Sequence, residues 1–176
     1  MVSMNLGCGK DIKKDHVNCD RVQLPGVDVL GDLEKGLPFK TSCVDYIFCR
    51  YVLEHFDDII PPMAEIHRVL KSGGTVHIEV PHCSWVGAYT DLTHKTFFSY
   101  QTMDVFEDGP HYGFFLKVKS RFKIIERKLH FSDHPKLNVL NAIINPIINR
   151  FPLVYERFFL WILPVNKIIF LMKTLK

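Results

Sequence analysis

The chain has 176 residues, of which 47% are hydrophobic and 23% are charged, and its formal net charge is +3. A chain of this length and apolar content forms one domain with a sizeable core. Its five cysteines form no CxxC pair, which is typical of reduced thiols in a cytoplasmic protein and excludes a disulfide framework. No apolar signal segment opens the chain, and no run reaches the roughly 20 apolar residues of a membrane span, so export is not expected.

Two glycines follow a short apolar stretch near the start of the chain, in the run Asn5-Leu6-Gly7-Cys8-Gly9-Lys10. Glycines directly after a strand let the backbone turn tightly and approach a ligand without interference from a Cβ atom. A second short strand, Val17 to Asp20, ends in a carboxylate that can accept both hydroxyl protons of a ribose. The two features together indicate a nucleotide-like cofactor.

Further strands follow in the order of an open α/β sheet. They are predicted at residues 27–30, 44–50 and 75–81, and the first of them leads to Asp32 at its carboxyl end. The connections to the second and third strands are shorter than the dozen or so residues that a full crossover helix needs. One or both of the first two helices should therefore be missing or reduced to a turn.

One helix is predicted between the last two of these strands. Asp57 and Asp58 form its N-cap, two prolines occupy its first turn, and apolar residues recur at helical spacing as far as Leu70. The basic and glycine-rich run 71–74 is predicted to end the helix before the next strand begins.

In this arrangement residues 2–82 resemble the class I S-adenosylmethionine-dependent methyltransferases, of the small type found among genes for polysaccharide assembly. The blocks that carry the resemblance are Asn5-Leu6-Gly7-Cys8-Gly9, Asp20, Asp32-Leu33, Leu37-Pro38-Phe39, Val44-Asp45-Tyr46-Ile47, Leu53-Glu54-His55-Phe56 and Glu65 to Gly74. The resemblance implies an α/β fold with a doubly wound, mostly parallel, Rossmann-like sheet. It also implies S-adenosyl-L-methionine as the cofactor and S-adenosyl-L-homocysteine as the product.

The same resemblance implies a set of cofactor-binding residues. The glycines would lie under the methionine part of the cofactor, Asp20 would bind the ribose, and Asp32 with Leu33 would bind the adenine. Arg50 and Tyr51 would line the pocket from the fourth strand. The full expected set is Asn5, Gly7, Cys8, Gly9, Asp20, Asp32, Leu33, Arg50, Tyr51 and His55.

Two departures from the resemblance leave other functions open. Most relatives carry an acid where this chain has Asn5, and Asp11 replaces the third glycine of the usual loop. An amide can orient the loop but cannot pair as a charge with the ammonium group of the cofactor. A non-catalytic nucleotide-binding module and a nicotinamide-dependent oxidoreductase are therefore the alternatives. The oxidoreductase is disfavoured because the spaced third glycine and its crossover helix are missing.

Catalytic residues are expected in the loop after the last parallel strand, where ligands lie in open α/β sheets. His82, Asp91 and His94 could converge there as a general base with its orienting carboxylate. Two imidazoles and a carboxylate could also bind a metal ion, although none is expected. A third interpretation is that these side chains only cap turns and hydrogen-bond to backbone. Glu54 is expected to make a structural hydrogen bond.

The C-terminal part contains a predicted hairpin and an apolar tail. Residues 112–118 and 122–130 are predicted to pair as an antiparallel hairpin at the sheet edge. The expected organisation is a cofactor-binding domain at 1–133 and an amphipathic helical extension at 134–176. In the extension six Lys or Arg residues accompany a single acid, Glu156. Leucines and isoleucines at 137–148 form one helical stripe, with asparagines opposite.

The extension has two possible roles. Its helices can pack on the domain or pair with a second subunit, or they can lie on an anionic membrane surface and approach a lipid-linked acceptor. Nucleic acid is not expected as a partner, because the basic residues are sparse among bulky aliphatics. The predicted function is methyl transfer to a small-molecule, sugar or glycolipid hydroxyl in the cytoplasm, with the inner membrane surface as the second location.

Overall fold

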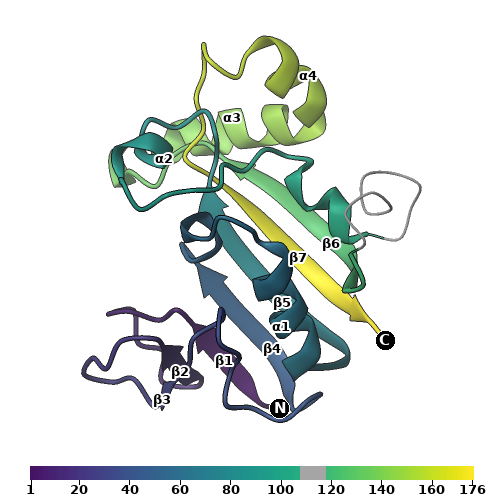
Figure 1. Ribbon diagram of the computed structural model, residues 1–176. Helices are drawn as coiled ribbons and strands as arrows, with labels where there is room; N and C mark the ends of the chain where they lie inside the picture. Colours follow the sequence, from purple (N-terminus) through teal and green to yellow (C-terminus); the bar gives the residue numbers. More distant parts are fainter. Residues whose placement is uncertain (108–117) are drawn as a thin grey trace.

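The computed structural model describes residues 1–107 and 118–176, which form one sheet with helices on one face and at one end (Figure 1). The strands are β1 (Ser3–Leu6), β2 (Val17–Asp20), β3 (Val29–Leu30), β4 (Val44–Arg50), β5 (Leu70–Pro81), β6 (Arg121–His130) and β7 (Lys167–Leu175). The α-helices are α1 (Ile60–Val69), α2 (Gly87–Thr90), α3 (Asn138–Arg150) and α4 (Pro152–Phe158). Short 3₁₀ helices are η1 (Leu53–His55), η2 (Thr102–Phe106) and η4 (Pro135–Leu137).

The seven strands of the described residues lie in the order β3-β2-β1-β4-β5-β7-β6. Strand β1 is parallel to β2 and β4, β2 is parallel to β3, and β4 is parallel to β5. Among the described strands, β7 alone runs opposite to the others, and it is antiparallel to both β5 and β6. The predicted α/β fold with a mostly parallel sheet is confirmed. Because parallel strands share one carboxyl edge, residues that follow β1, β2 and β4 come together there.

The first two crossover helices are replaced by turns, as the short connections predicted. The described residues between β1 and β2 and between β2 and β3 contain no helix. The buried side chain of Asn18 organises the first turn, since its Oδ1 accepts hydrogen bonds from Lys13 N (2.9 Å) and Asn5 Nδ2 (3.0 Å). Its Nδ2 donates to the carbonyls of Lys13 and His16. One amide therefore satisfies backbone groups that a helix would have paired internally.

Helix α1 begins at Ile60 with Ile59 as its N-cap, two residues after the predicted cap at Asp57 and Asp58. It also ends earlier than predicted, and the following strand is longer. Asp58 Oδ1 accepts a hydrogen bond from Ile60 N (2.8 Å) at the start of the helix. Leu70 is already extended and pairs with Val44 of β4. The run 71–74 therefore belongs to β5 and does not cap the helix, which corrects the prediction. Residues 71–74 lie where the register between β4 and β5 shifts, between the pairs Val44–Leu70 and Tyr46–Thr75, and Gly73 adopts a positive φ of 71° there.

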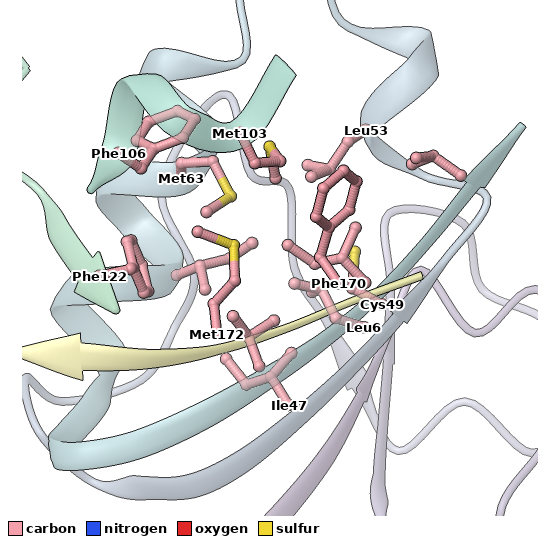
Figure 2. Close-up of a cluster of buried hydrophobic side chains, with 14 of the residues drawn as sticks. Leu6, Ile47, Cys49, Leu53, Met63, Met103, Phe106, Phe122, Phe170 and Met172 are labelled. Atoms are coloured by element: carbon pink, nitrogen blue, oxygen red, sulfur yellow. The ribbon is translucent and has the colours of Figure 1, made fainter. Parts of the chain in front are cut away.

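The core lies on one face of the sheet, under α1 and η2 (Figure 2). Alternate residues of β4, β5 and β7 point into it, because side chains alternate between the two faces of a strand. The labelled residues of Figure 2 are Leu6, Ile47, Cys49, Leu53, Met63, Met103, Phe106, Phe122, Phe170 and Met172. On the opposite face the ring of Phe48 lies between the Lys13 ammonium, 4.4 Å from its centroid, and the His77 ring at 5.2 Å.

The C-terminal segment is a strand of the sheet, and this corrects the prediction of a wholly helical extension. Strand β7 lies between β5 and β6 and buries Ile168, Phe170 and Met172 completely. It is the partner of β6. The hairpin was predicted to pair 122–130 with 112–118. Residues 112–117 lie outside the described residues, and Val118 is not in a strand. Since β7 completes the core, residues beyond 133 are required by the sheet itself.

Helix α3 packs with its polar face inward. Asn149 Oδ1 accepts from Leu129 N (2.8 Å) of β6, and Asn145 Oδ1 accepts from Phe131 N (2.8 Å), just beyond the strand. Asn141 makes the same contact with Ser132 N at 3.0 Å. The asparagines thus satisfy the backbone of an edge strand, which would otherwise be open to further pairing. Of the apolar stripe, Leu140, Ile143 and Ile147 face outward, whereas Ile148 is buried and Ile144 packs against the core.

Candidate active site

A pocket of about 200 Å³ opens at the carboxyl ends of β1, β2 and β4. Its walls come from the glycine loop, the ends of β2 and β3, the residues after β4 and the loop after β5. The lining residues are Leu6, Gly7, Asp20, Arg21, Gly31, Asp32, Leu33, Tyr51, Val52, His55, Phe56 and Thr93. Thus the pocket lies at the edge where the topology places ligands in open α/β sheets.

Gly7 is required at the floor of this pocket. Its φ is +64°, and a Cβ added there would lie 2.3 Å from Cγ2 of Val52. Any side chain would therefore strain the backbone and collide with the pocket wall. Tyr51, directly after β4, also has a positive φ of 57°. Both special conformations turn the backbone sharply where a ligand would approach.

The carboxylate of Asp20 is held at the pocket by two backbone groups. Oδ2 accepts from Gly9 N (2.8 Å) and Oδ1 accepts from Val22 N (2.9 Å). Each oxygen keeps a further lone pair, so the carboxylate can still accept hydroxyl protons from a ligand. Asp32 is oriented similarly, since its Oδ1 accepts from Glu34 N at 3.0 Å. Both carboxylates are therefore held by backbone groups at the pocket and can still accept hydrogen bonds from a ligand.

The structure places six of the ten expected cofactor residues on the pocket, namely Gly7, Asp20, Asp32, Leu33, Tyr51 and His55. Asn5, Cys8, Gly9 and Arg50 do not line it. Asn5 is buried and donates to Asp11 O (2.6 Å) and Asn18, so it supports the loop from behind. Arg50 forms an ion pair with Asp11 at 3.0 Å. Six lining residues were not among the predicted site residues, although each is the direct neighbour of one: Leu6, Arg21, Gly31, Val52, Phe56 and Thr93.

His82 does not reach the pocket, and this corrects the expectation that it joins Asp91 and His94. The ring is completely buried, and its Nδ1 lies 2.8 Å from Ser84 Oγ and accepts from Ser84 N at 3.2 Å. Its Nε2 lies 3.0 Å from Glu156 Oε1 of α4. Since Nδ1 accepts, Nε2 carries the proton and donates to the carboxylate. His82 therefore joins the end of β5 to α4.

Asp91 and His94 come together beside the pocket, with His55. His94 Nε2 lies 3.8 Å from Asp91 Oδ2, and the rings of His94 and His55 are 5.0 Å apart. Thr93 links the two sides, because its Oγ1 donates to Asp91 Oδ1 (2.7 Å) and lies 2.9 Å from His55 Nδ1. Hydrogen bonds from Thr93 lower the pKa of Asp91. Two of the three predicted catalytic residues thus share a site, with His55 as the third member.

Glu54 is also part of this site, and the predicted structural hydrogen bond of its side chain is not observed. The residue is 1% exposed, and within the described part of the chain neither carboxylate oxygen has a hydrogen-bond partner. Burial raises the pKa of Glu54 to about 7. Its backbone carbonyl accepts from Lys95 N (2.7 Å), which holds the loop after β5 against η1.

Comparison with known proteins agrees with this geometry. Residues 6–78 match the family model described as a methyltransferase domain, and the match contains the glycine loop, Asp20, Asp32 and η1. The fold is similar to that of solved S-adenosylmethionine-dependent methyltransferases. Demethylmenaquinone methyltransferase of Chlorobaculum tepidum is 27% identical over 73 residues, which are 42% of this chain. The chain spans only 30% of the length of that methyltransferase.

Solved structures share the methyltransferase fold along nearly the whole chain. An S-adenosylmethionine-dependent methyltransferase from Archaeoglobus fulgidus has a TM-score of 0.57 at 16% identity, covering 97% of this chain and 85% of its own. The [4+2]-cyclase SpnF has a TM-score of 0.59 at 17% identity, covering 98% of this chain and 75% of its own. At these identities the likeness is one of fold, and the reaction must be argued from the site.

Proposed function

We propose that this chain is an S-adenosylmethionine-dependent methyltransferase. The observation that carries the proposal is a pocket with a glycine floor at Gly7 and an oriented carboxylate at Asp20, directly beside the imidazoles of His55 and His94. When bound, S-adenosylmethionine supplies an electrophilic methyl group. The protein's own contribution is to hold an acceptor atom in line with that group and to accept its proton.

The proposed acceptor is a hydroxyl group of a sugar, a glycolipid or another small molecule. A hydroxyl must lose its proton as it is methylated, and the site offers Asp91 and His94 for that purpose. A carbon or nitrogen acceptor that needs no base would make little use of this pair. The sugar or glycolipid class further rests on the resemblance to enzymes of polysaccharide assembly.

Calorimetry with the full chain tests cofactor binding. S-adenosylmethionine and S-adenosylhomocysteine should each bind, and Asp20→Ala should weaken binding by about 1–3 kcal/mol because the ribose hydroxyls lose their acceptor. Asp15→Ala is the matched control, since Asp15 is exposed in the turn before β2. Binding of a nicotinamide dinucleotide alone would favour an oxidoreductase. Binding of S-adenosylmethionine without turnover of any hydroxyl acceptor would favour a non-catalytic module.

The outward face of α3 and α4 is the second feature with a functional consequence. We define the apolar face as Leu140, Ile143, Ile147, Phe151, Leu153, Val154, Phe158, Phe159, Trp161 and Ile162, which are each at least 42% exposed. Between the two helices lies a hollow of about 330 Å³, lined entirely by apolar residues and Tyr155. Contiguous apolar surface of this kind marks an interaction site. No helix of the described residues is long and apolar enough to cross a bilayer.

The charges around the apolar face favour an anionic membrane surface as its partner. Arg150 and Arg157 stack on Phe151 and Phe158 at 5.7 and 5.6 Å, so cations accompany the apolar side chains. The single acid of this region, Glu156, is turned inward to His82. A second copy of the chain would bring like charges together, whereas anionic headgroups would neutralise them.

The membrane proposal also explains the position of α4 beside the active-site loop. The bond between His82 and Glu156 fixes α4 at the carboxyl end of β5, where the acceptor side of the site begins. A chain lying on a membrane through its apolar face would therefore present the site to a lipid-linked acceptor. Helices that lie in the interface bind through buried apolar area together with attraction to anionic lipid.

Vesicle sedimentation of the full chain tests this proposal. The protein should sediment with phosphatidylglycerol vesicles more than with phosphatidylcholine vesicles, and added salt should release it, because screening weakens the attraction of the arginines. A Trp161→Ser, Ile143→Ser double variant should lose binding, whereas Val2→Ser, at an exposed valine by the N-terminus and at the opposite end of the sheet from α3 and α4 (Figure 1), should not. A concentration-dependent dimer that ignores vesicles would replace the membrane with a second copy.

A further inference from the structure

Glu54, His55 and His94 each offer one ligand atom to a common point. One carboxylate oxygen and one nitrogen from each ring all lie within 4.8 Å of one another. Glu54 and His55 belong to η1 after β4, and His94 belongs to the loop after β5. The bond from Lys95 N to the Glu54 carbonyl (2.7 Å) keeps the two segments together. This backbone hydrogen bond therefore holds His94 close to Glu54 and His55.

The Glu54 carboxylate is oriented into this cluster without a partner in the described residues. Glu54 is 1% exposed, and neither of its carboxylate oxygens accepts a hydrogen bond from the described residues. A buried carboxylate without a cation or a donor is costly to retain. The imidazoles of His55 and His94 lie close to this carboxylate, but the Nδ1 proton of each ring is already directed to another group.

Hydrogen bonds fix the proton of each imidazole ring, His55 and His94, on its Nδ1 atom. His94 Nδ1 lies 3.0 Å from the Ala88 carbonyl, which only accepts, so Nδ1 carries the proton. His55 Nδ1 faces Thr93 Oγ1, whose own proton goes to Asp91. His55 Nδ1 therefore donates as well, and each neutral ring keeps a lone pair on Nε2. Metal-binding histidines are oriented by outer hydrogen bonds of this type.

We infer that Glu54, His55 and His94 bind a divalent transition-metal ion, for which zinc is the best fit. Two neutral imidazoles and one carboxylate form a common zinc ligand set, and a site with three protein ligands leaves a position open. His55 lines the pocket, so the open position would face it. The sequence analysis expected no metal and considered His82, Asp91 and His94 as the alternative ligand set, but His82 is turned into the core.

This binding does not depend on the proposed methyl transfer. If the chain is a methyltransferase, the ion would orient an oxygen of the acceptor beside the cofactor pocket. In that role Asp91 would act through Thr93 as an outer partner of His55, and His94 would be a ligand. The ion would then lower the pKa of the acceptor hydroxyl, and so assist the proton removal that Asp91 and His94 would otherwise perform as a base.

Zinc titration of the metal-stripped full chain by calorimetry tests the site. One Zn²⁺ should bind per chain, and Glu54→Gln and His94→Gln should each weaken binding by about 10-fold or more. His77→Gln is the matched control, because it removes an imidazole beside a carboxylate, Glu79, that Lys167 already neutralises at 2.9 Å. If either variant unfolds, as judged by circular dichroism, His55→Gln replaces it. Cobalt substitution should give the visible absorption of a tetrahedral ion.

Two outcomes would overturn the inference. One is that zinc does not bind at one ion per chain. The other is that His77→Gln lowers the affinity for zinc while the variants of Glu54, His55 and His94 do not. Binding of S-adenosylmethionine, measured on the same metal-stripped chain, separates this inference from the proposed function. Cofactor binding without zinc binding would remove only the metal site. Zinc binding without cofactor binding would remove only the methyltransferase proposal.

Discussion

The two halves of the loop after β5 contain histidines with opposite surroundings. In the first half, His82 is fully buried, and both ring nitrogens are occupied by Ser84 and Glu156. In the second half, His94 has one nitrogen on the Ala88 carbonyl, and the other lies 3.8 Å from Asp91 beside the pocket. Sequence alone gives these residues the same candidate role. Their partners separate them.

This difference shows which property makes a histidine available for chemistry. A ring whose two nitrogens are both satisfied by protein groups has no lone pair for a substrate or an ion, and its removal affects stability. A ring held by one nitrogen alone presents the other, with its tautomer already fixed. The comparison can be tested by changing each half of the loop in turn.

The largest effect is expected for His94→Gln. Turnover per folded molecule should fall roughly 10²–10⁴-fold, because proton removal from the acceptor is needed only in the transition state. The affinity for S-adenosylmethionine, measured by calorimetry, should remain nearly unchanged. His67→Gln is a suitable control, since His67 lies on α1 and contacts the Leu175 carbonyl at 3.1 Å. Unchanged turnover with a lowered melting temperature would place His94 in the same structural class as His82.

A smaller effect, on stability, is expected for His82→Gln. The change leaves the partly buried Glu156 carboxylate without its ring donor and should cost about 1–3 kcal/mol of unfolding free energy. Denaturant unfolding measures this loss, and turnover per folded molecule should be retained. Lys14→Gln, at an exposed position in the turn before β2, should leave stability unchanged. If His82→Gln instead abolished turnover in a stable protein, the comparison between the two halves would be wrong.

The smallest effect concerns a third histidine–carboxylate pair, which lies on the sheet between β5 and β7. Burial opposes the charged form of Glu79, but hydrogen bonds from His77 and Lys167 and the charge of Lys167 lower its pKa to about 2. A depressed pKa contributes stability that is fully present above the ordinary value of 4.5 and is lost as pH falls toward 2. Unfolding measured from pH 6 to pH 2.5 should show this loss, and Glu79→Gln should show less of it. Equal acid sensitivity in both proteins would contradict the assignment.

The tail provides the clearest limit of local sequence patterns. The stripe at 137–148 and the asparagines opposite it correctly predict the amphipathic helix α3. The pattern does not reveal that the asparagines face the protein, because this depends on an edge strand whose backbone needs partners. Strand β7 was missed for a related reason. Its apolar run fits a helix or a strand equally well until β5 and β6 are in place on either side.

The sequence by itself determined the order of the parallel strands, the absence of the early crossover helices and the pocket positions of Gly7, Asp20 and Asp32. These features follow from local causes: strand periodicity, connection length, and residue types with special conformations or charge at strand ends. Tertiary structure decided that His82 is buried against α4, that the Glu54 carboxylate has no hydrogen-bond partner among the described residues, and that α3 turns its asparagines toward the sheet edge. Each of these depends on which distant group meets a side chain, and spacing along the chain does not encode that contact.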